Sequence, residues 1–291
     1  MTTKSPKILL LGDYSNCHNT LAKGLKHLGC DVTVVSDGSR WINCDRDFDI
    51  SRKPGKLGGI QHFLNLRFGK IARILSGNDI VAIHDLNFVQ LRPDRLRYIF
   101  DRLVKNNRSV FLTAMSTDIA FLDMLEDPAS PLAYSEWFVD GRKSRLFESH
   151  PEMWEEWHAK PLVDFQRHAL SKIDGAVSVL YEYQLGIEKA LGADKTAYGG
   201  IPIDTDCFTP VEMPDKIKKV KLFLGRDRNR KLVKGSDYLE TAARRVVEKH
   251  PGKAELTIVE NKTFDEFTEL MKNSHVVLDQ IYSYTWILYP S

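Results

Sequence analysis

Long apolar runs, paired cysteines and an excess of either charge are all missing from this sequence of 291 residues. The most apolar stretches, Ile8 to Leu11 and Val276 to Leu278, are far shorter than the ~20 residues that a membrane-spanning helix needs. The four cysteines form no C-x-x-C pair, so neither a zinc knuckle nor a redox dithiol is indicated. The polar N-terminus contains no secretory signal, and a cytoplasmic protein is expected. A formal net charge of +2 disfavours a protein whose main role is to coat nucleic acid.

Apolar runs of strand length alternate with segments of helical periodicity, which is typical of a parallel sheet covered by helices on both faces. In the clearest unit, Lys7 to Leu11 reads as a strand, a helix ends at Gly29, and Val32 to Val35 forms the next strand. The pattern predicts the α/β class, with two Rossmann-like, doubly wound domains. Further strands are expected at Asp79 to Ile83, Val110 to Leu112, Gly175 to Leu180, Val220 to Leu224, Leu256 to Val259 and His275 to Ile281.

Turn-forming residues from Gly199 to Pro214 indicate a linker between the two domains. The first domain is expected over residues 1–210, with an aromatic-rich helical insertion around 119–172. Residues 211–291 supply three strands and two helices, half of a doubly wound domain, and end in the apolar run Tyr284 to Tyr289. The second domain is therefore predicted to be incomplete, which favours self-association through the edge of its sheet.

The strongest chemical motif spans the end of one strand and the start of the next helix. Phe223-Leu224-Gly225-Arg226 closes the strand, and Lys234-Gly235 precedes the helix. The carboxyl edge of a parallel sheet and the N–H groups of a helix start both favour phosphate, and Arg and Lys add positive charge. A diphosphate is the expected ligand. The alternative is a solvated basic loop that contains Arg226, Arg228, Arg230 and Lys231.

These motifs, in this order, resemble the glycosyltransferases of the GT-B fold, family 4, in a bacterial branch. The Gly-Arg…Lys-Gly pattern resembles the opening of that family's donor domain. The stretch Gly200 to Pro210 is similar to its interdomain motif, and Leu11 to Asn16 is similar to its first loop. The resemblance covers essentially the whole chain. It implies transfer of a sugar from a nucleotide-sugar, with retention, no cofactor and no essential metal.

The resemblance also implies roles for individual residues. The donor diphosphate would be bound by Gly225, Arg226, Lys234 and Gly235. The acceptor-side loop would consist of Gly12, Asp13, Tyr14, Ser15 and Asn16. Three features depart from the family pattern. The first loop has a single glycine, Thr113-Ala114-Met115 stands where Thr-x-His is usual, and no Glu-x7-Glu segment follows Tyr284.

His84 is the candidate catalytic residue, because His84-Asp85 follows a strand at the carboxyl edge of the sheet. A structural hydrogen-bonding role is the alternative for this histidine. Asp204-Thr205-Asp206 has the spacing of a metal-binding DxD, but its linker position favours a turn, and no metal is expected. The tryptophans of the insertion are predicted to serve in packing, with stacking on a sugar or an acyl chain as the alternative.

The leading hypothesis is a glycosyltransferase of surface polysaccharide synthesis that takes a nucleotide-sugar donor and a glycan or lipid-linked acceptor. Peripheral association with the inner face of the membrane fits this hypothesis, and nucleic acid is not an expected partner. One alternative is a nucleotide-sugar epimerase of the same fold, which requires a histidine and carboxylates converging on the sugar. Another is a truncated, non-catalytic remnant that acts as a binding module.

Overall fold

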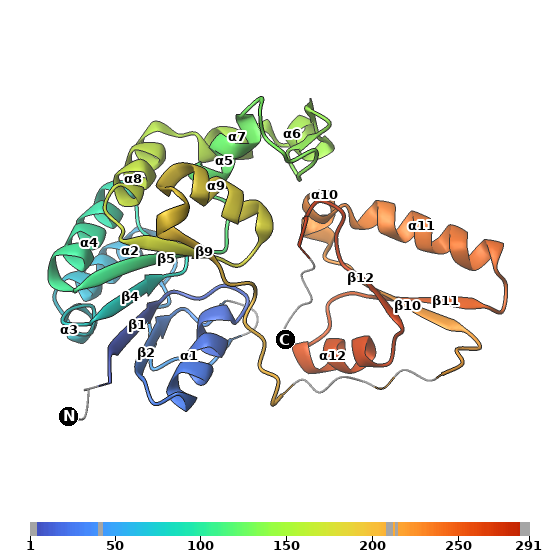
Figure 1. The fold of residues 1–291 in the computed structure, drawn as a ribbon, viewed down its shortest axis with the longest axis horizontal. Coiled ribbons are helices and arrows are strands. Elements are labelled where there is room, and N and C mark those ends of the chain that lie inside the picture. Colours follow the sequence, from blue (N-terminus) through green and yellow to red (C-terminus); the bar gives the residue numbers. More distant parts are fainter. Residues whose placement is uncertain (1–4, 40–42, 208–211, 213–214, 286–291) are drawn as a thin grey trace. The chain divides into compact units, whose positions relative to one another are not determined.

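The computed structural model describes residues 5–39, 43–207, 212 and 215–285 (Figure 1). The last residues of the predicted linker motif, Phe208 to Pro210, and most of the apolar run that ends at Tyr289 lie outside the described residues. The chain divides into two compact units. The first contains Met1–Ser130 and Glu155–Asp204, and the second contains Pro131–Trp154 and Thr205–Tyr289.

The first unit is built on a parallel sheet of seven strands in the order β3-β2-β1-β4-β5-β8-β9. The chain runs from β1 to β2 on one side and later places β4 on the other side of β1, so the direction of winding reverses between β1 and β4. Ligands of open α/β sheets bind at such a topological switch point. The strands are β1 (Lys7–Leu11), β2 (Asp31–Ser36), β3 (Phe48–Asp49), β4 (Ile80–Ile83), β5 (Ser109–Ala114), β8 (Gly175–Ser178) and β9 (Thr196–Tyr198).

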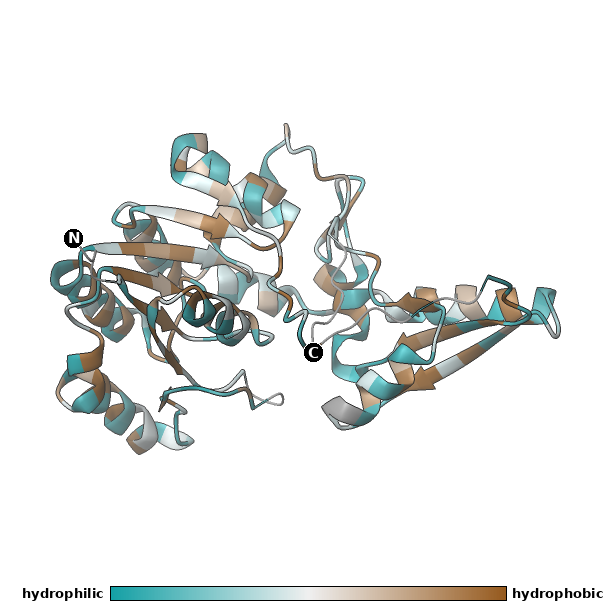
Figure 2. Cartoon of the chain, turned by 60° about the horizontal axis from the view of Figure 1, so that its bottom comes forward, coloured by the Kyte–Doolittle hydropathy of each residue, from teal (hydrophilic) through white to brown (hydrophobic). Residues whose placement is uncertain are grey.

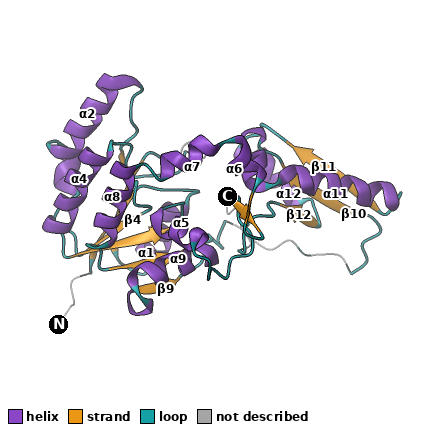
Figure 3. Ribbon diagram, turned by 90° about the horizontal axis from the view of Figure 1, so that it is seen from above, coloured by secondary structure: helices purple, strands orange, loops and turns teal. Residues whose placement is uncertain are grey.

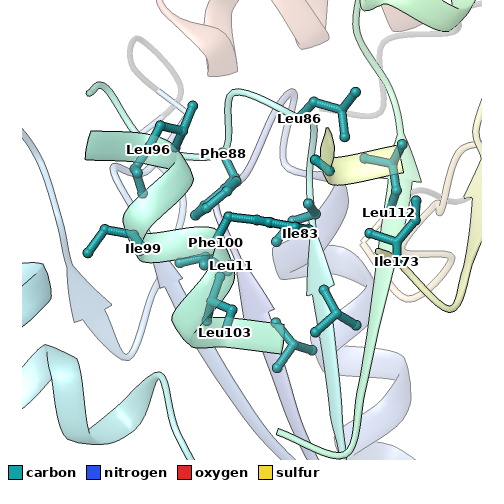
Figure 4. Close-up of a cluster of buried hydrophobic side chains, with 14 of the residues drawn as sticks. Leu11, Ile83, Leu86, Phe88, Leu96, Ile99, Phe100, Leu103, Leu112 and Ile173 are labelled. Carbon is teal, nitrogen blue, oxygen red and sulfur yellow. The ribbon is translucent and has the colours of Figure 1, made fainter. Parts of the chain in front are cut away.

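Apolar side chains of β1 enter two hydrophobic clusters. Ile8 and Leu10 belong to one cluster, and Leu9 and Leu11 belong to the other. Because successive side chains of a strand point to opposite faces, both faces of β1 are covered, as its continuous apolar run predicts. Figure 4 shows the larger cluster, where the side chains of α4 meet those of the sheet. The helices of this unit are α1 (Cys17–His27), α2 (Gly55–Arg67), α3 (Lys70–Ile74), α4 (Pro93–Asn106), α5 (Ile119–Glu126), α8 (Lys160–Leu170) and α9 (Tyr181–Leu191), with a short 3₁₀ turn at Ala193–Lys195.

The insertion differs from the prediction in its extent. A helical insertion in the first domain was expected around 119–172, and within this range α5 and α8 contribute Ala120, Phe165 and Ala169 to the larger core cluster. Only Pro131–Trp154 separates from the first unit and groups with the second. This segment contains the hairpin β6 (Phe138–Val139) and β7 (Arg142–Lys143), helix α6 (Arg145–Ser149) and the start of α7 (Pro151–Trp157).

The rings of this segment pack on one another. Trp137 is 3% exposed and lies 5.2 Å from Trp154 and 6.3 Å from Phe147, measured between ring centroids. Trp137 therefore forms a small core, which agrees with the predicted packing role for this tryptophan.

The second unit is built on a parallel sheet of three strands in the order β11-β10-β12, flanked by helices. The winding reverses here too, between β10 and β12. The elements are β10 (Val220–Gly225), a 3₁₀ turn (Arg228–Arg230), α10 (Lys231–Lys234), α11 (Ser236–Lys249), β11 (Ala254–Val259), α12 (Phe264–Lys272) and β12 (Val276–Leu278). The predicted α/β class with two Rossmann-like units in one chain is therefore confirmed.

Local signals explain the boundaries of the second unit. A capping box forms at α12, where Thr263 accepts the N–H of Glu266 and Glu266 accepts the N–H of Thr263. β12 ends at Leu278, whereas the sequence predicted a strand through Ile281. The difference arises because the side chain of Asp279 pairs with Lys234 and the N–H of Ile281 donates to the carbonyl of Lys234.

Figure 2 shows apolar strands inside each unit and more polar helices around them. Within the part of the chain that the structure describes, every helix is too short or too polar to cross a membrane.

Candidate functional site

The first unit brings two of the predicted segments together at its switch point. Gly12 follows β1 and His84 follows β4, and the N–H of His84 donates to the carbonyl of Leu11 at 3.0 Å. Gly12 has a φ of +77°, and a Cβ placed on it would lie 1.9 Å from Nδ1 of His84. Only glycine fits both constraints, because an added methyl group would collide with the imidazole in a backbone conformation that L-residues disfavour. The absence of a side chain at residue 12 thus determines where the His84 ring lies.

The loop from Gly12 to Asn16 has an unusual backbone. Ser15 and Asn16 also have positive φ values, 53° and 63°, in the left-handed region. Tyr14 is 41% exposed, while the neighbouring Asp13 is buried. Non-glycine residues in this region carry backbone strain, and such strain clusters at functional sites. The predicted acceptor-side loop is therefore a conformationally constrained loop at the switch point.

Asp13 faces the first turn of α1. Its carboxylate accepts the N–H groups of His18 at 3.2 Å and Asn19 at 3.0 Å. Burial raises the pKa of Asp13 to about 6, because these hydrogen bonds only partly offset the cost of a buried charge. A carboxyl group with a pKa near neutrality can both accept and donate a proton at physiological pH.

His18 connects three elements beneath this loop. Its Nδ1 lies 2.8 Å from the carbonyl of Gly12 and its Nε2 lies 2.9 Å from Oγ1 of Thr113 in β5. The carbonyl oxygen requires a proton on Nδ1, so Nε2 accepts the Thr113 hydroxyl. Burial, together with a smaller effect of the neighbouring His84, lowers the pKa of His18 to about 3. His18 therefore stays neutral and braces the loop.

His84, Asp85 and Ser116 form a second polar group at the same edge of the sheet. Nε2 of His84 lies 3.5 Å from Oδ2 of Asp85, and Ser116 donates its hydroxyl to that oxygen at 3.0 Å. Nδ1 of His84 and Oδ1 of Asp85 are buried and have no hydrogen-bond partner among the described residues. Buried polar atoms are nearly always paired, so two unpaired atoms side by side at this edge of the sheet are exceptional.

Gly12 to Asn16 and His84 are separate candidates in the sequence, and the structure brings them together. His18 is not among the sequence candidates, because nothing in the local pattern connects this residue with Thr113, 95 positions away.

The second unit places the predicted phosphate-binding residues around its own switch point. Gly225 ends β10, and a Cβ there would lie 2.6 Å from the ring of Phe267. Arg226 follows, and its guanidinium pairs with Glu240 of α11 and with Glu260 after β11. Arg228 pairs with the same Glu260 at 2.8 Å. The carboxylates hold Arg226 at the end of the strand and neutralise its charge.

Lys234 lies across the same switch point. Its side chain is 7% exposed, and its Nζ lies 2.6 Å from Oδ1 of Asp279, the residue that follows β12. Gly235 has a φ of +64° and is the N-cap of α11, where a Cβ would lie 2.4 Å from Ile281. Ser236 is 1% exposed, and its hydroxyl oxygen has no hydrogen-bond partner among the described residues. The helix start thus presents N–H groups, a buried hydroxyl and a buried ammonium at one place.

Asp204 of the DxD sequence forms an ion pair with Lys23 at 3.2 Å. Across the described residues, no group of three or more His, Cys, Asp or Glu side chains is arranged to hold a metal ion.

No protein-family model matches the chain, and no curated protein sequence matches it. Several solved structures have detectable similarity. The S. aureus MnaA–UDP co-structure is 11% identical, covers 95% of this chain and 70% of its own, and has a TM-score of 0.48. The UDP-GlcNAc 2-epimerase from Neisseria meningitidis bound to UDP-GlcNAc is 12% identical, with 95% and 72% covered and a TM-score of 0.42. The glycotransferase of kitacinnamycin is 10% identical, with 88% and 66% covered and a TM-score of 0.43.

None of the three proteins is described as a family 4 glycosyltransferase, so the narrower family assignment stays a prediction.

Proposed function

We propose that the chain is a nucleotide-sugar enzyme of the GT-B type, which binds the donor diphosphate at the switch point of its second unit. The observation that carries this proposal is the buried ammonium of Lys234 beside the N-terminus of α11. A charged group is rarely retained in a protein interior unless it is paired or functional. Here it is paired with Asp279, whose Oδ2 is buried and has no hydrogen-bond partner among the described residues.

The proposed diphosphate site combines three kinds of donor. The backbone N–H groups at the start of α11 and the Ser236 hydroxyl contact one phosphate. Arg226, whose Nε and Nη1 pair with Glu260 and Glu240, presents the N–H donors of Nη2 to the other. Lys234 supplies a point charge. Together these groups stabilise the negative charge that develops on a departing nucleoside diphosphate.

Calorimetric titration with UDP, GDP and their sugars tests this site. We expect micromolar binding, and we expect Arg226→Met to weaken it by about 10- to 100-fold, the loss of one charge-assisted interaction. Arg228→Met is the matched control, because Arg228 also pairs with Glu260 but is 76% exposed. Failure of the folded chain to bind any of these nucleotides, or equal losses in the two variants, would contradict the proposed site.

The proposed reaction is transfer of the sugar to a glycan or lipid-linked acceptor that binds at the first unit. Asp13 and His84, at the switch point of that unit, are the proposed proton acceptors for the acceptor hydroxyl. As the C–O bond to the donor breaks, the nucleoside diphosphate leaves with the bonding electrons and the acceptor oxygen bonds to the sugar. Acceptor-dependent release of the nucleotide measures this reaction.

Epimerisation of a nucleotide-sugar is a second candidate, favoured by one feature of the first unit. Asp13, His84 and Asp85 form the histidine and carboxylate set that this reaction requires, and the pKa of Asp13 is raised by burial to about 6. In this reaction a base removes a carbon-bound proton of the sugar, and an acid returns a proton to the opposite face.

Proton NMR in deuterium oxide distinguishes the two candidates. Incorporation of deuterium into the sugar without any acceptor supports the epimerase. Release of nucleotide that requires an acceptor, without deuterium incorporation, supports the transferase.

A further inference from the structure

Helix α2 presents apolar residues to solvent along its outer face. Leu57 is 82% exposed, Ile60 44%, Leu64 46% and Phe68, which follows the helix, 62%. Their spacing of three or four residues places them in one narrow stripe along the helix. The opposite face is buried through Gly58, His62 and Leu66. A surface helix normally pairs an apolar inner face with a polar outer face, so the stripe requires an explanation.

The stripe lies in a strongly basic part of the chain. No Asp or Glu occurs between Asp49 and Asp79, whereas that interval contains six basic residues, Arg52, Lys53, Lys56, Arg67, Lys70 and Arg73. The whole chain has a net charge of only +2, so this positive charge is concentrated locally. Figure 3 shows α2 at the margin of the first unit, beside α4.

A hollow of about 490 Å³ continues the stripe beyond Phe68. Three arginines line it, Arg67, Arg73 and Arg102, together with Gly69 and Ser76. The guanidinium of Arg67 lies over the ring of Phe68 at 4.6 Å, and Arg102 donates to the carbonyl of Arg67 at 2.6 Å. Among the described residues, none of these three arginines is paired with a carboxylate. The hollow is therefore a concentrated source of unneutralised positive charge.

We propose that α2 and α3 form a docking surface for a bilayer that contains anionic phospholipid. The apolar stripe enters the interfacial layer, the lysines and arginines contact the headgroups, and the arginine-lined hollow receives a lipid phosphate. The proposal is independent of the function proposed above, because it uses none of the residues at either switch point.

Charge and polarity argue against other occupants. A second copy paired about a two-fold axis would bring the same six basic residues against each other without any carboxylate from this interval. Nucleic acid would satisfy the positive charge but would leave the apolar stripe in contact with water. A bilayer with anionic headgroups complements both features.

Flotation of the full chain with lipid vesicles tests the proposal. We expect binding to vesicles of phosphatidylglycerol and phosphatidylcholine in equal parts, little binding to phosphatidylcholine alone, and weaker binding at high salt. Leu57→Glu should weaken the binding about tenfold, since it removes one apolar side chain from the contact with the bilayer and adds a negative charge. Leu28→Glu is the matched control, because Leu28 is 78% exposed at the end of α1.

A second pair of variants tests the arginine-lined hollow. Arg73→Glu should also weaken vesicle binding, whereas Arg92→Glu, at an exposed position on the N-terminal end of α4, should not. Thermal unfolding establishes that each variant is folded.

Two results would overturn the proposal. The first is that the folded chain does not float with anionic vesicles, or that Leu57→Glu and Leu28→Glu bind alike. The second is that sedimentation equilibrium finds a dimer that Leu57→Glu dissociates, without any vesicle binding, which would make the stripe an interface between copies.

Discussion

The imidazole of His84 occupies the space into which a Cβ of residue 12 would project, with Nδ1 1.9 Å from the position of that atom. The two residues are 72 positions apart in the sequence. The imidazole can lie here only because residue 12 has no side chain, and with the imidazole in place only glycine fits at residue 12. The contact joins the ends of β1 and β4, the two strands between which the winding of the first sheet reverses.

Gly12→Ala should displace His84 and destabilise the first unit. The strained backbone alone should cost about 1–2 kcal/mol of unfolding free energy, and the collision with the imidazole should add to it. Gly77→Ala is the control that measures the cost of backbone strain alone. Gly77 has a φ of +76° and no atom within 4 Å of its Cβ position. Urea unfolding measures both variants. If both variants lose the same unfolding free energy, the collision with His84 does not contribute to the destabilisation.

His18 should make stability depend on pH. Its pKa is about 3 in the folded protein, against an ordinary value of 6.5, so the unfolded chain binds the extra proton first as the pH falls. The contribution of His18 to the unfolding free energy is therefore complete above about pH 6.5. Below that pH it decreases by about 1.4 kcal/mol for every pH unit, down to about pH 3. His18→Gln should reduce this slope. The difference between the unfolding profiles of variant and parent isolates the contribution of His18.

Lys234 and Asp279 should be strongly coupled. Asp279→Asn removes the carboxylate that pairs with the buried ammonium of Lys234 and should cost about 3–5 kcal/mol of unfolding free energy. Lys234→Met with Asp279→Asn should cost less than the sum of the two single changes, since either single change already removes the ion pair between the two side chains. A double-mutant cycle from urea unfolding gives the coupling energy, and strict additivity would rule out an interaction between the two side chains.

Arg145 should fix the segment Pro131–Trp154 to the second unit. Its guanidinium forms two hydrogen bonds with Asp237 of α11, at 2.8 and 3.0 Å, and lies over the ring of Tyr238. The pair is partly exposed, so Arg145→Ala should cost only about 1 kcal/mol in global stability. It should nevertheless increase cleavage of the segment under limited proteolysis. Arg142→Ala, an exposed change in the adjacent hairpin, is the control, and equal cleavage of the two variants would contradict this role.

The sequence was sufficient for features that depend on short-range signals. The strand at Lys7 to Leu11 and the helix start after Gly235 are each determined within a few residues, and the structure confirms them. These signals also located both candidate sites at the carboxyl ends of strands. The parallel sheets followed from the alternation of strand and helix patterns.

The partners within each site could not be predicted in the same way. His18 meets Thr113, Lys234 meets Asp279 and Arg145 meets Asp237 over separations of 95, 45 and 92 residues. Such pairings depend on strand order and on how helices pack, and a single sequence gives no period or spacing that specifies them. The same limitation explains why the whole of 119–172 was predicted as an insertion. The aromatic residues of 131–154 and the core residues of α5 and α8 have similar composition but pack in different units.

The assignment of Pro131–Trp154 to the second unit has a consequence for synthesis of the chain. A ribosome makes this segment before residues 155–204, which complete the first sheet, and well before α11, which carries its partner Asp237. During that interval Trp137 and the neighbouring rings have only each other to pack against. A gene divided between the two units at the linker would leave the first product with this segment permanently unpartnered. The two halves of this protein are consequently not separable at a single cut, even though each has its own sheet.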